Sequence, residues 1–373
     1  MHIGFDAKRL FLNFTGLGNY SRRLVSQYHE AYPEDAISLL TPKIKADQRT
    51  QPFITDTAYS VIQPHGFKPL WRMMDMVGDI RAANLDVYHG LSHELPIGLS
   101  KLNIGKVVTI HDLIFKYYPQ DYAFMDRQIY DLKWKHACRT ADVIIAISEQ
   151  TKADIIEFYQ VRPEKIKVLY QGADDIFAVP VDREGVLLAQ KKYALPEVYN
   201  LYVGSVISRK NLVAIVKAMA LQKKSDQVPL VIIGQGNSYT KEVLKAATAA
   251  GISHLLIWLG SPSFADFPAI YKGAGMMIYP SFYEGFGLPV IEAMQVGIPV
   301  ITSNQSSLKE AGGKAALLID PHAPEEIATA MTGIQGDQSL CREMVLKGFE
   351  HLATLSANSG MDQYHSLYQS LKP

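Results

Sequence analysis

This sequence of 373 residues has few cysteines, no net charge and no long apolar run. Its two cysteines, Cys138 and Cys341, lie far apart and show no metal-binding spacing, which favours reduced structural thiols over a disulfide framework. Lys plus Arg and Asp plus Glu both number 37, so bulk charge gives no argument for a nucleic-acid partner. No apolar run approaches the roughly 18 residues that a spanning helix needs, and no apolar signal region precedes the first strand pattern. We therefore expect a cytoplasmic protein, at most peripheral to a membrane.

Hydrophobic content of 48% and charged content of 20% describe a globular chain, and its length predicts two or three domains. Strand-like and helix-like segments alternate throughout, which is typical of α/β domains with parallel sheets. Periodicity weakens between 178 and 195, which we interpret as a linker. The predicted domains are residues 1–180 and 195–355, with 356–373 as a final helix.

Candidate functional residues are most concentrated between residues 283 and 300. A buried strand is followed by a loop that carries Glu284 between glycines, and Pro289 suits the first turn of the next helix. The free N–H groups and dipole of that helix start favour a bound anion. Glu284 and Glu292, eight residues apart, could each accept hydrogen bonds from sugar hydroxyls. An ordinary strand, loop and helix with two solvated glutamates is the alternative interpretation.

Two adjacent cations stand at a second strand-to-helix loop. Arg209 and Lys210 follow Val203-Gly204, where a helix start again attracts anions, so they suit a diphosphate clamp. Solvated surface cations are the alternative.

In the first half of the chain, Gly16 and Gly18 belong to an expected turn that opens onto a helix and lets the backbone approach a phosphate. Their spacing is not that of the dinucleotide fingerprint, so it does not support a dehydrogenase. A plain turn with no ligand is the alternative interpretation. His111 ends a buried strand, and the neighbouring Asp112 could orient its ring.

The stretch with Glu284 and Glu292 resembles the Glu-x7-Glu signature of the retaining glycosyltransferases of family 4 (group 1), which have the GT-B fold. The segment from Val203 to Leu212 resembles that family's phosphate-binding element, except that Ser205 stands where some members carry an arginine. The glycine loop and His111 match in the same order, so the resemblance covers nearly the whole chain. It implies two Rossmann-like domains with parallel sheets facing across a cleft, and a last helix that crosses back to the first domain.

The resemblance also implies roles for individual residues. Glu284, His111, Arg209 and Lys210 would be catalytic, with His111 beside the donor sugar and the two cations on the departing diphosphate. Glu292 would bind the ribose, and the loop around Ser263 would hold the base. The expected donor-binding positions are Gly16, Gly18, Gly204, Arg209, Lys210, Ser263, Phe286, Gly287, Leu288 and Glu292.

The resemblance further predicts transfer of a hexose to a glycan or lipid-linked acceptor in polysaccharide biosynthesis, with no cofactor. No Asp-x-Asp sequence is present, in keeping with a metal-independent enzyme. GDP-mannose is favoured over UDP-glucose because the likeness is to mannosyltransferases. Another GT-B enzyme, such as an epimerase, and a non-catalytic nucleotide-sugar-binding partner of a synthase complex stay open.

The segment 65–84 mixes apolar residues with Lys68, Arg72 and Arg81. Packing of an amphipathic helix on the domain core is the favoured interpretation. A basic helix that lies on a membrane is the alternative.

Overall fold

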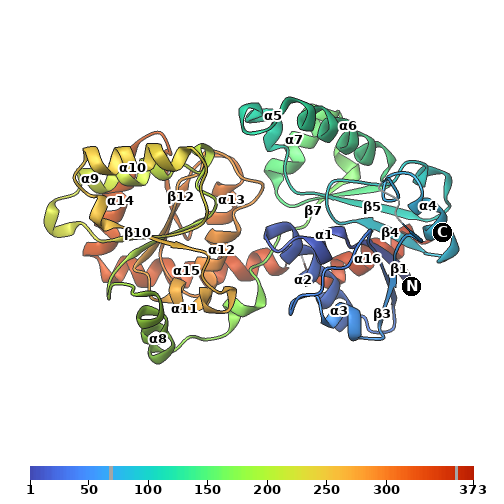
Figure 1. Ribbon diagram of the computed structural model, residues 1–373, viewed down its shortest axis with the longest axis horizontal. Helices are drawn as coiled ribbons and strands as arrows, with labels where there is room; N and C mark the ends of the chain where they lie inside the picture. The colour runs from blue at the N-terminus through green and yellow to red at the C-terminus, as the bar shows by residue number, and fades with distance from the viewer. Residues whose placement is uncertain (67–69, 358–359) are drawn as a thin grey trace. The chain divides into compact units, whose positions relative to one another are not determined.

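A computed structural model describes residues 1–66, 70–357 and 360–373. The chain divides into two compact units, each built on its own parallel sheet (Figure 1). Unit 1 comprises residues 1–171 and 358–373, and unit 2 comprises residues 172–357. Among the described residues, no helix has the length and apolar character needed to cross a membrane.

Unit 1 contains a seven-stranded sheet in the order β3-β2-β1-β4-β5-β6-β7. Its strands are β1 (His2–Asp6), β2 (Ala36–Leu40), β3 (Tyr59–Ile62), β4 (Val87–Gly90), β5 (Gly105–Ile110), β6 (Val143–Ala146) and β7 (Ile166–Val168). Its helices are α1 (Lys8–Leu12), α2 (Gly16–Ala31), α3 (Pro52–Thr55), α4 (Met76–Ala82), α5 (Ile114–Tyr117), α6 (Phe124–Thr140), α7 (Glu149–Tyr159) and α16 (Met361–Leu371).

Unit 2 contains a six-stranded sheet in the order β10-β9-β8-β11-β12-β13. Its strands are β8 (Asn200–Val203), β9 (Leu230–Ile233), β10 (Leu256–Gly260), β11 (Met276–Tyr279), β12 (Val300–Ser303) and β13 (Leu317–Ile319). Its helices are α8 (Arg183–Tyr193), α9 (Leu212–Leu221), α10 (Tyr239–Ala249), α11 (Phe267–Lys272), α12 (Leu288–Gln295), α13 (Leu308–Gly312), α14 (Pro324–Gly336) and α15 (Gln338–Ala357).

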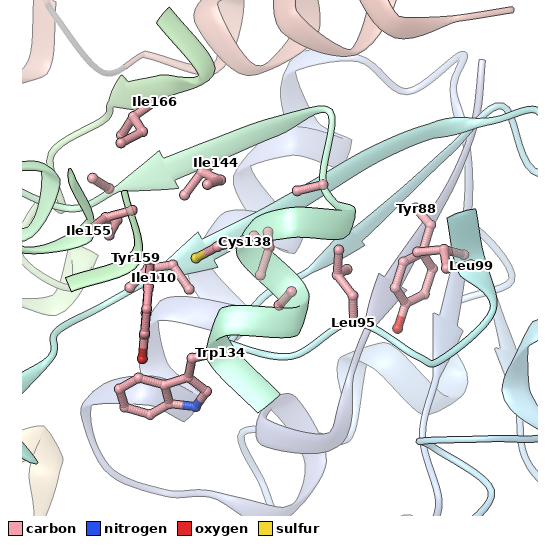
Figure 2. Packing of buried hydrophobic residues seen from close by; sticks show 14 of the residues in the cluster. Tyr88, Leu95, Leu99, Ile110, Trp134, Cys138, Ile144, Ile155, Tyr159 and Ile166 are labelled. Carbon is pink, nitrogen blue, oxygen red and sulfur yellow. The ribbon is translucent and has the colours of Figure 1, made fainter. Parts of the chain in front are cut away.

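Alternate residues of the unit 1 strands enter two separate cores, one on each face of the sheet. On β5, Val108 belongs to the core that contains Trp134 and Cys138, whereas Val107 belongs to the other. Figure 2 shows the first core, with side chains of α6 packed against the strands. Burial on both faces explains why the strand β6, with the sequence VIIA, is a continuous apolar run rather than an alternating one. Cys138 is a buried free thiol, as the sequence indicates.

Strand order reverses once in each unit, and the loops beside each reversal carry some of the expected site residues. The chain leaves β1 for one side of the sheet and returns at β4, and it leaves β8 and returns at β11. Ligands of open parallel sheets collect at the carboxyl ends of the strands beside such a reversal.

The last helix packs on unit 1, as expected from the sequence. Tyr364 and Tyr368 of α16 are buried, and the Tyr368 hydroxyl lies 2.7 Å from Nδ1 of His89 in β4. The helix thereby fixes a buried polar side chain of a central strand.

Two sequence-based interpretations are wrong in part. Most of the expected linker is the helix α8, which Asp182 begins by accepting the N–H of Gly185 at 2.8 Å. Among the described residues of the segment 65–84, only those of α4 are α-helical, while Trp71, Met76 and Ile80 are buried in the core. Lys68 lies outside the described residues. The favoured core-packing interpretation is thus confirmed for the apolar residues of α4.

Candidate functional site

The loops after β8 and β11 bring three of the four expected catalytic residues together in unit 2. Arg209 and Lys210 lie in a short 3₁₀ turn (Ser208–Lys210) before α9. Glu284 lies between β11 and α12. The Phe282 N–H donates to the Arg209 carbonyl at 2.9 Å, which fastens one loop to the other.

One carboxylate oxygen of Glu284, Oε1, is contacted by the side chains of Arg209, Lys210 and Tyr279. Its Oε1 lies 3.1 Å from an Arg209 guanidinium nitrogen and 3.1 Å from Lys210 Nζ. The Tyr279 hydroxyl, which accepts from Lys210, donates to the same oxygen at 3.0 Å. Within the described parts of the chain, Oε2 receives no hydrogen bond. A ligand hydroxyl could therefore bind Oε2 without displacing the two cations.

Electrostatics keep this carboxylate charged. Burial alone raises the pKa of Glu284, but Arg209 and Lys210 overcome it and lower the pKa to about 2. The side chain is only 12% exposed, so the two cations are little screened by water. At neutral pH the three side chains sum to one positive charge, which suits an approaching polyanion.

Gly204 and Gly287 lie in the loops at the carboxyl ends of β8 and β11. Gly204 follows β8 with φ of 148°, and a Cβ there would lie 3.1 Å from Lys210 Nζ. Gly287 caps α12 with φ of 126°, and a Cβ there would lie 2.7 Å from Leu308 Cδ2. Only glycine fits both the backbone and the space at residue 287. Gly287 and Leu288, two of the expected donor-binding positions, lie at the start of α12, where backbone N–H groups point out of the helix, and Phe286 directly precedes them. Their contact with the donor stays a prediction.

Glu292 has a hydrogen-bond partner of its own outside the Glu284 cluster. It is the fifth residue of α12, about one turn into the helix. The Tyr271 hydroxyl donates to Oε2 of Glu292 at 2.6 Å. Burial raises the pKa of Glu292 to about 7, with Asp174 acting in the same direction. Near neutral pH this carboxyl is therefore poised between its protonated and ionised forms.

The expected base-binding loop is held by the helix that the sequence did not predict. The Ser263 N–H donates to the Tyr193 hydroxyl at 3.1 Å. That hydroxyl in turn donates to Asp266 at 2.6 Å, and Lys192 binds the same carboxylate oxygen at 2.6 Å. Tyr193, Tyr271 and Tyr279 all support the expected site residues, and no motif in the sequence marks them.

Gly16 and Gly18 belong to unit 1 and differ in the space around them. Gly16 is the first residue of α2, and a Cβ there would meet nothing within 4 Å. Gly18 lies inside α2, and a Cβ there would lie 1.7 Å from the Asn13 carbonyl oxygen. Local packing alone therefore requires glycine at residue 18. Their expected role in donor binding stays a prediction.

His111 lies at the carboxyl end of β5 with both ring nitrogens occupied. Its Nε2–H donates to the Leu91 carbonyl at 2.9 Å, and the Gln171 amide donates to Nδ1 at 2.9 Å. Burial lowers the pKa of His111 to about 4, so the ring is neutral. Asp112 instead accepts the Ile114 N–H at 3.1 Å, so the expectation that it orients His111 is wrong.

Two family models together match most of the chain. Residues 14–176 match the family described as Glycosyltransferase Family 4, and residues 187–351 match Glycosyl transferases group 1. The chain is similar to O-antigen chain mannosyltransferase B of Escherichia coli, with 28% identity over 90% of this chain and 91% of that protein.

Solved structures share the fold at lower identity. Sucrose-phosphate synthase from Thermosynechococcus elongatus superposes with a TM-score of 0.77 and 21% identity, over 100% of this chain and 99% of that one. Anabaena HepE in complex with UDP-glucose superposes with a TM-score of 0.72 and 18% identity, over 100% and 98% of the two chains. These likenesses confirm the predicted α/β fold of two Rossmann-like domains.

Proposed function

Because this chain belongs to family 4 of the glycosyltransferases and has the GT-B type of fold, we propose that it is a retaining hexosyltransferase of polysaccharide biosynthesis. It moves a hexose from a nucleotide diphosphate sugar to a glycan or lipid-linked acceptor. The cluster of Arg209, Lys210 and Glu284 at the β8–β11 reversal carries the proposal, because it combines cations for a diphosphate with a carboxylate for sugar hydroxyls.

Departure of the nucleoside diphosphate builds negative charge on its phosphate oxygens. Arg209, Lys210 and the N-terminus of α12 stabilise that charge, and they are held in place before the reaction begins. Glu284 remains ionised and accepts a donor-sugar hydroxyl on Oε2. Retention follows either from attack on the same face or from a covalent intermediate, and both routes use this arrangement.

Mannose is the favoured sugar, with GDP-mannose as donor. The support is the likeness to an O-antigen mannosyltransferase over nine-tenths of both chains. HepE binds UDP-glucose, which keeps that donor as the second candidate. Transfer is proposed to need no metal, since Arg209 and Lys210 supply two positive charges that could neutralise a diphosphate as a metal would.

Incubation of the purified protein with GDP-mannose or UDP-glucose and simple glycosides tests the function. We expect a new glycoside whose anomeric configuration, read by NMR, matches that of the donor, in the presence of EDTA. Inversion would contradict the retaining assignment, and loss of activity with EDTA would contradict metal independence. Binding of the donor without transfer or hydrolysis would favour a non-catalytic partner, and a changed sugar on the nucleotide would favour an epimerase.

A lipid-linked acceptor would require contact with a membrane surface, and α6 offers an apolar face for it. The exposed fractions of Phe124, Met125, Ile129 and Leu132 are 63%, 66%, 43% and 71%. Arg127, Lys133, Lys135 and Arg139 lie on the same helix, against the two acids Asp126 and Asp131. Excess positive charge beside exposed apolar side chains suits the inner face of a membrane with anionic lipids.

Flotation with phosphatidylglycerol vesicles checks this contact. Phe124→Ser with Leu132→Ser should abolish binding, whereas Leu187→Ser with Leu188→Ser on α8 should leave it unchanged. Equal binding by both double variants would exclude α6 as the contact.

A further inference from the structure

Three imidazoles meet near the carboxyl edge of the unit 1 sheet. His89 lies in β4, His93 in the loop after β4, and His111 directly after β5. All three are at least 95% buried. The rings of His93 and His111 lie 5.2 Å apart between centroids.

The protein completes the hydrogen bonds of two of these rings. His111 is held by Leu91 and Gln171, as described above. His89 has Tyr368 Oη 2.7 Å from its Nδ1 and Thr109 Oγ1 2.8 Å from its Nε2. Neither ring keeps a nitrogen for a ligand.

His93 is the exception. Its Nδ1 is buried without a hydrogen-bond partner among the described residues, and its ring makes no other hydrogen bond to them. The ring stacks on Trp134 of α6 at 4.0 Å with an interplanar angle of 12°. Trp134 lies at the edge of the group of side chains in Figure 2.

The backbone at His93 is also unusual. Its φ of 62° lies in the left-handed region, which few residues other than glycine adopt. Its N–H donates to the Thr109 carbonyl at 2.9 Å, so the conformation is fixed by β5. A strained backbone and an unpaired buried nitrogen at one residue are two costs that the fold alone does not repay.

We propose that His93 binds a hydroxyl of the saccharide acceptor, which completes the hydrogen bonds that the protein leaves unmade. The inference rests on the proposed transferase function and adds an acceptor-binding residue to it. Burial, the neighbouring His111 and the cations Arg9 and Arg72 lower the pKa of His93, so the ring is neutral. A neutral imidazole offers one donor and one acceptor, which fits a hydroxyl better than a charged group.

Two variants separate this role from a structural one. His93→Phe keeps a ring to stack on Trp134 and removes both nitrogens. His93→Gly suits the positive φ and leaves space that added imidazole can fill. His136→Phe is the matched control, because its Nε2 is likewise buried without a partner among the described residues but it lies outside the three-ring cluster.

The assay uses methyl α-D-mannopyranoside and methyl α-D-glucopyranoside as acceptors, with donor hydrolysis by water measured in parallel. His93→Phe should raise the acceptor KM roughly three- to tenfold, the loss expected for one hydrogen bond, with donor hydrolysis unchanged. His93→Gly should show the same defect, and imidazole but not benzene should correct it. His136→Phe should behave as the wild type.

An unchanged acceptor KM in both His93 variants would overturn the inference. An equal fall in transfer and donor hydrolysis that imidazole does not correct would also overturn it, because that pattern marks a purely structural residue. Failure of the wild type to transfer to either glycoside or to hydrolyse the donor would instead contradict the proposed function. The two failures are therefore distinguishable.

Discussion

Lys210 Nζ and Oε1 of Glu284 lie 3.1 Å apart, and Arg209 binds that same oxygen. The carboxylate therefore holds both cations through one atom and leaves the other for a ligand. This arrangement explains how a loop can be preorganised by an ion pair and still offer its carboxylate to a sugar. We therefore expect removal of Glu284 to affect both stability and activity.

Replacement of Glu284 by Gln should destabilise unit 2 and reduce turnover. The native pKa of about 2 lies below the ordinary value of 4.5, which corresponds to about 3 kcal/mol of stability at pH 7. Because the pKa is depressed in the folded state, this contribution is present above pH 4.5 and is lost as pH falls toward 2. Thermal melts of both proteins between pH 7 and pH 3 should therefore converge as the pH falls.

The control for that comparison is Glu343→Gln, because Glu343 is 58% exposed and pairs with Lys347 on the helix surface. Its melts should match those of the wild type at every pH. A constant difference between wild type and Glu284→Gln across the pH range would show that charge is not the cause.

Donor binding should strengthen as pH rises through 7 if Glu292 accepts ribose hydroxyls. The raised pKa of about 7 leaves about a tenth of this carboxyl ionised at pH 6 and about nine-tenths at pH 8. A ligand that prefers the carboxylate should bind about tenfold more tightly at pH 8. Calorimetric titration with the donor at both pH values measures the ratio of the two dissociation constants. In Glu292→Gln the dissociation constant should not change with pH.

The stability of the ligand-free protein should fall as pH rises, whereas donor binding should strengthen. A carboxyl whose pKa is raised on folding stabilises the protein at low pH and loses that contribution as pH rises from 4.5 through 7. Comparison of wild type and Glu292→Gln by thermal melting over this window isolates the effect. Parallel melting curves would refute the raised pKa.

Alanine at Gly287 should cost stability at the start of α12. The positive φ and the close approach to Leu308 predict a loss of roughly 1–3 kcal/mol. Gly333→Ala, inside α14 with open space around its Cβ position, should instead gain about 0.5–1 kcal/mol. Denaturant unfolding of the two variants should therefore move in opposite directions from the wild type.

The sequence predicted those features that depend on local patterns. Buried apolar runs such as β5 and β11 were recognisable, as were the glycine and cation loops that follow strands. It missed β2 and β3, which carry no motif, and α8, whose prolines at either end resemble a linker.

Partners that come from distant segments could not be predicted. Nothing in the local sequence indicates that Tyr193 holds the Ser263 loop or that Gln171 and Leu91 occupy both nitrogens of His111. Such contacts depend on which loops the sheet order brings together. The sequence therefore indicated the charged residues that cluster in the candidate site, but not the tyrosines and carbonyls that contact them.

Binding of a nucleotide sugar's diphosphate by Arg209 and Lys210 can be measured by thermal melting with GDP-, UDP- and ADP-sugars in the absence of metal. A ligand at 100 times its Kd should stabilise the folded protein by about 2.7 kcal/mol, so one nucleotide should raise Tm. Lys210→Met should lose this shift, whereas Lys347→Met, on the surface of α15, should retain it. No shift with any nucleotide sugar, or an equal shift in Lys210→Met, would show that these cations do not bind the diphosphate.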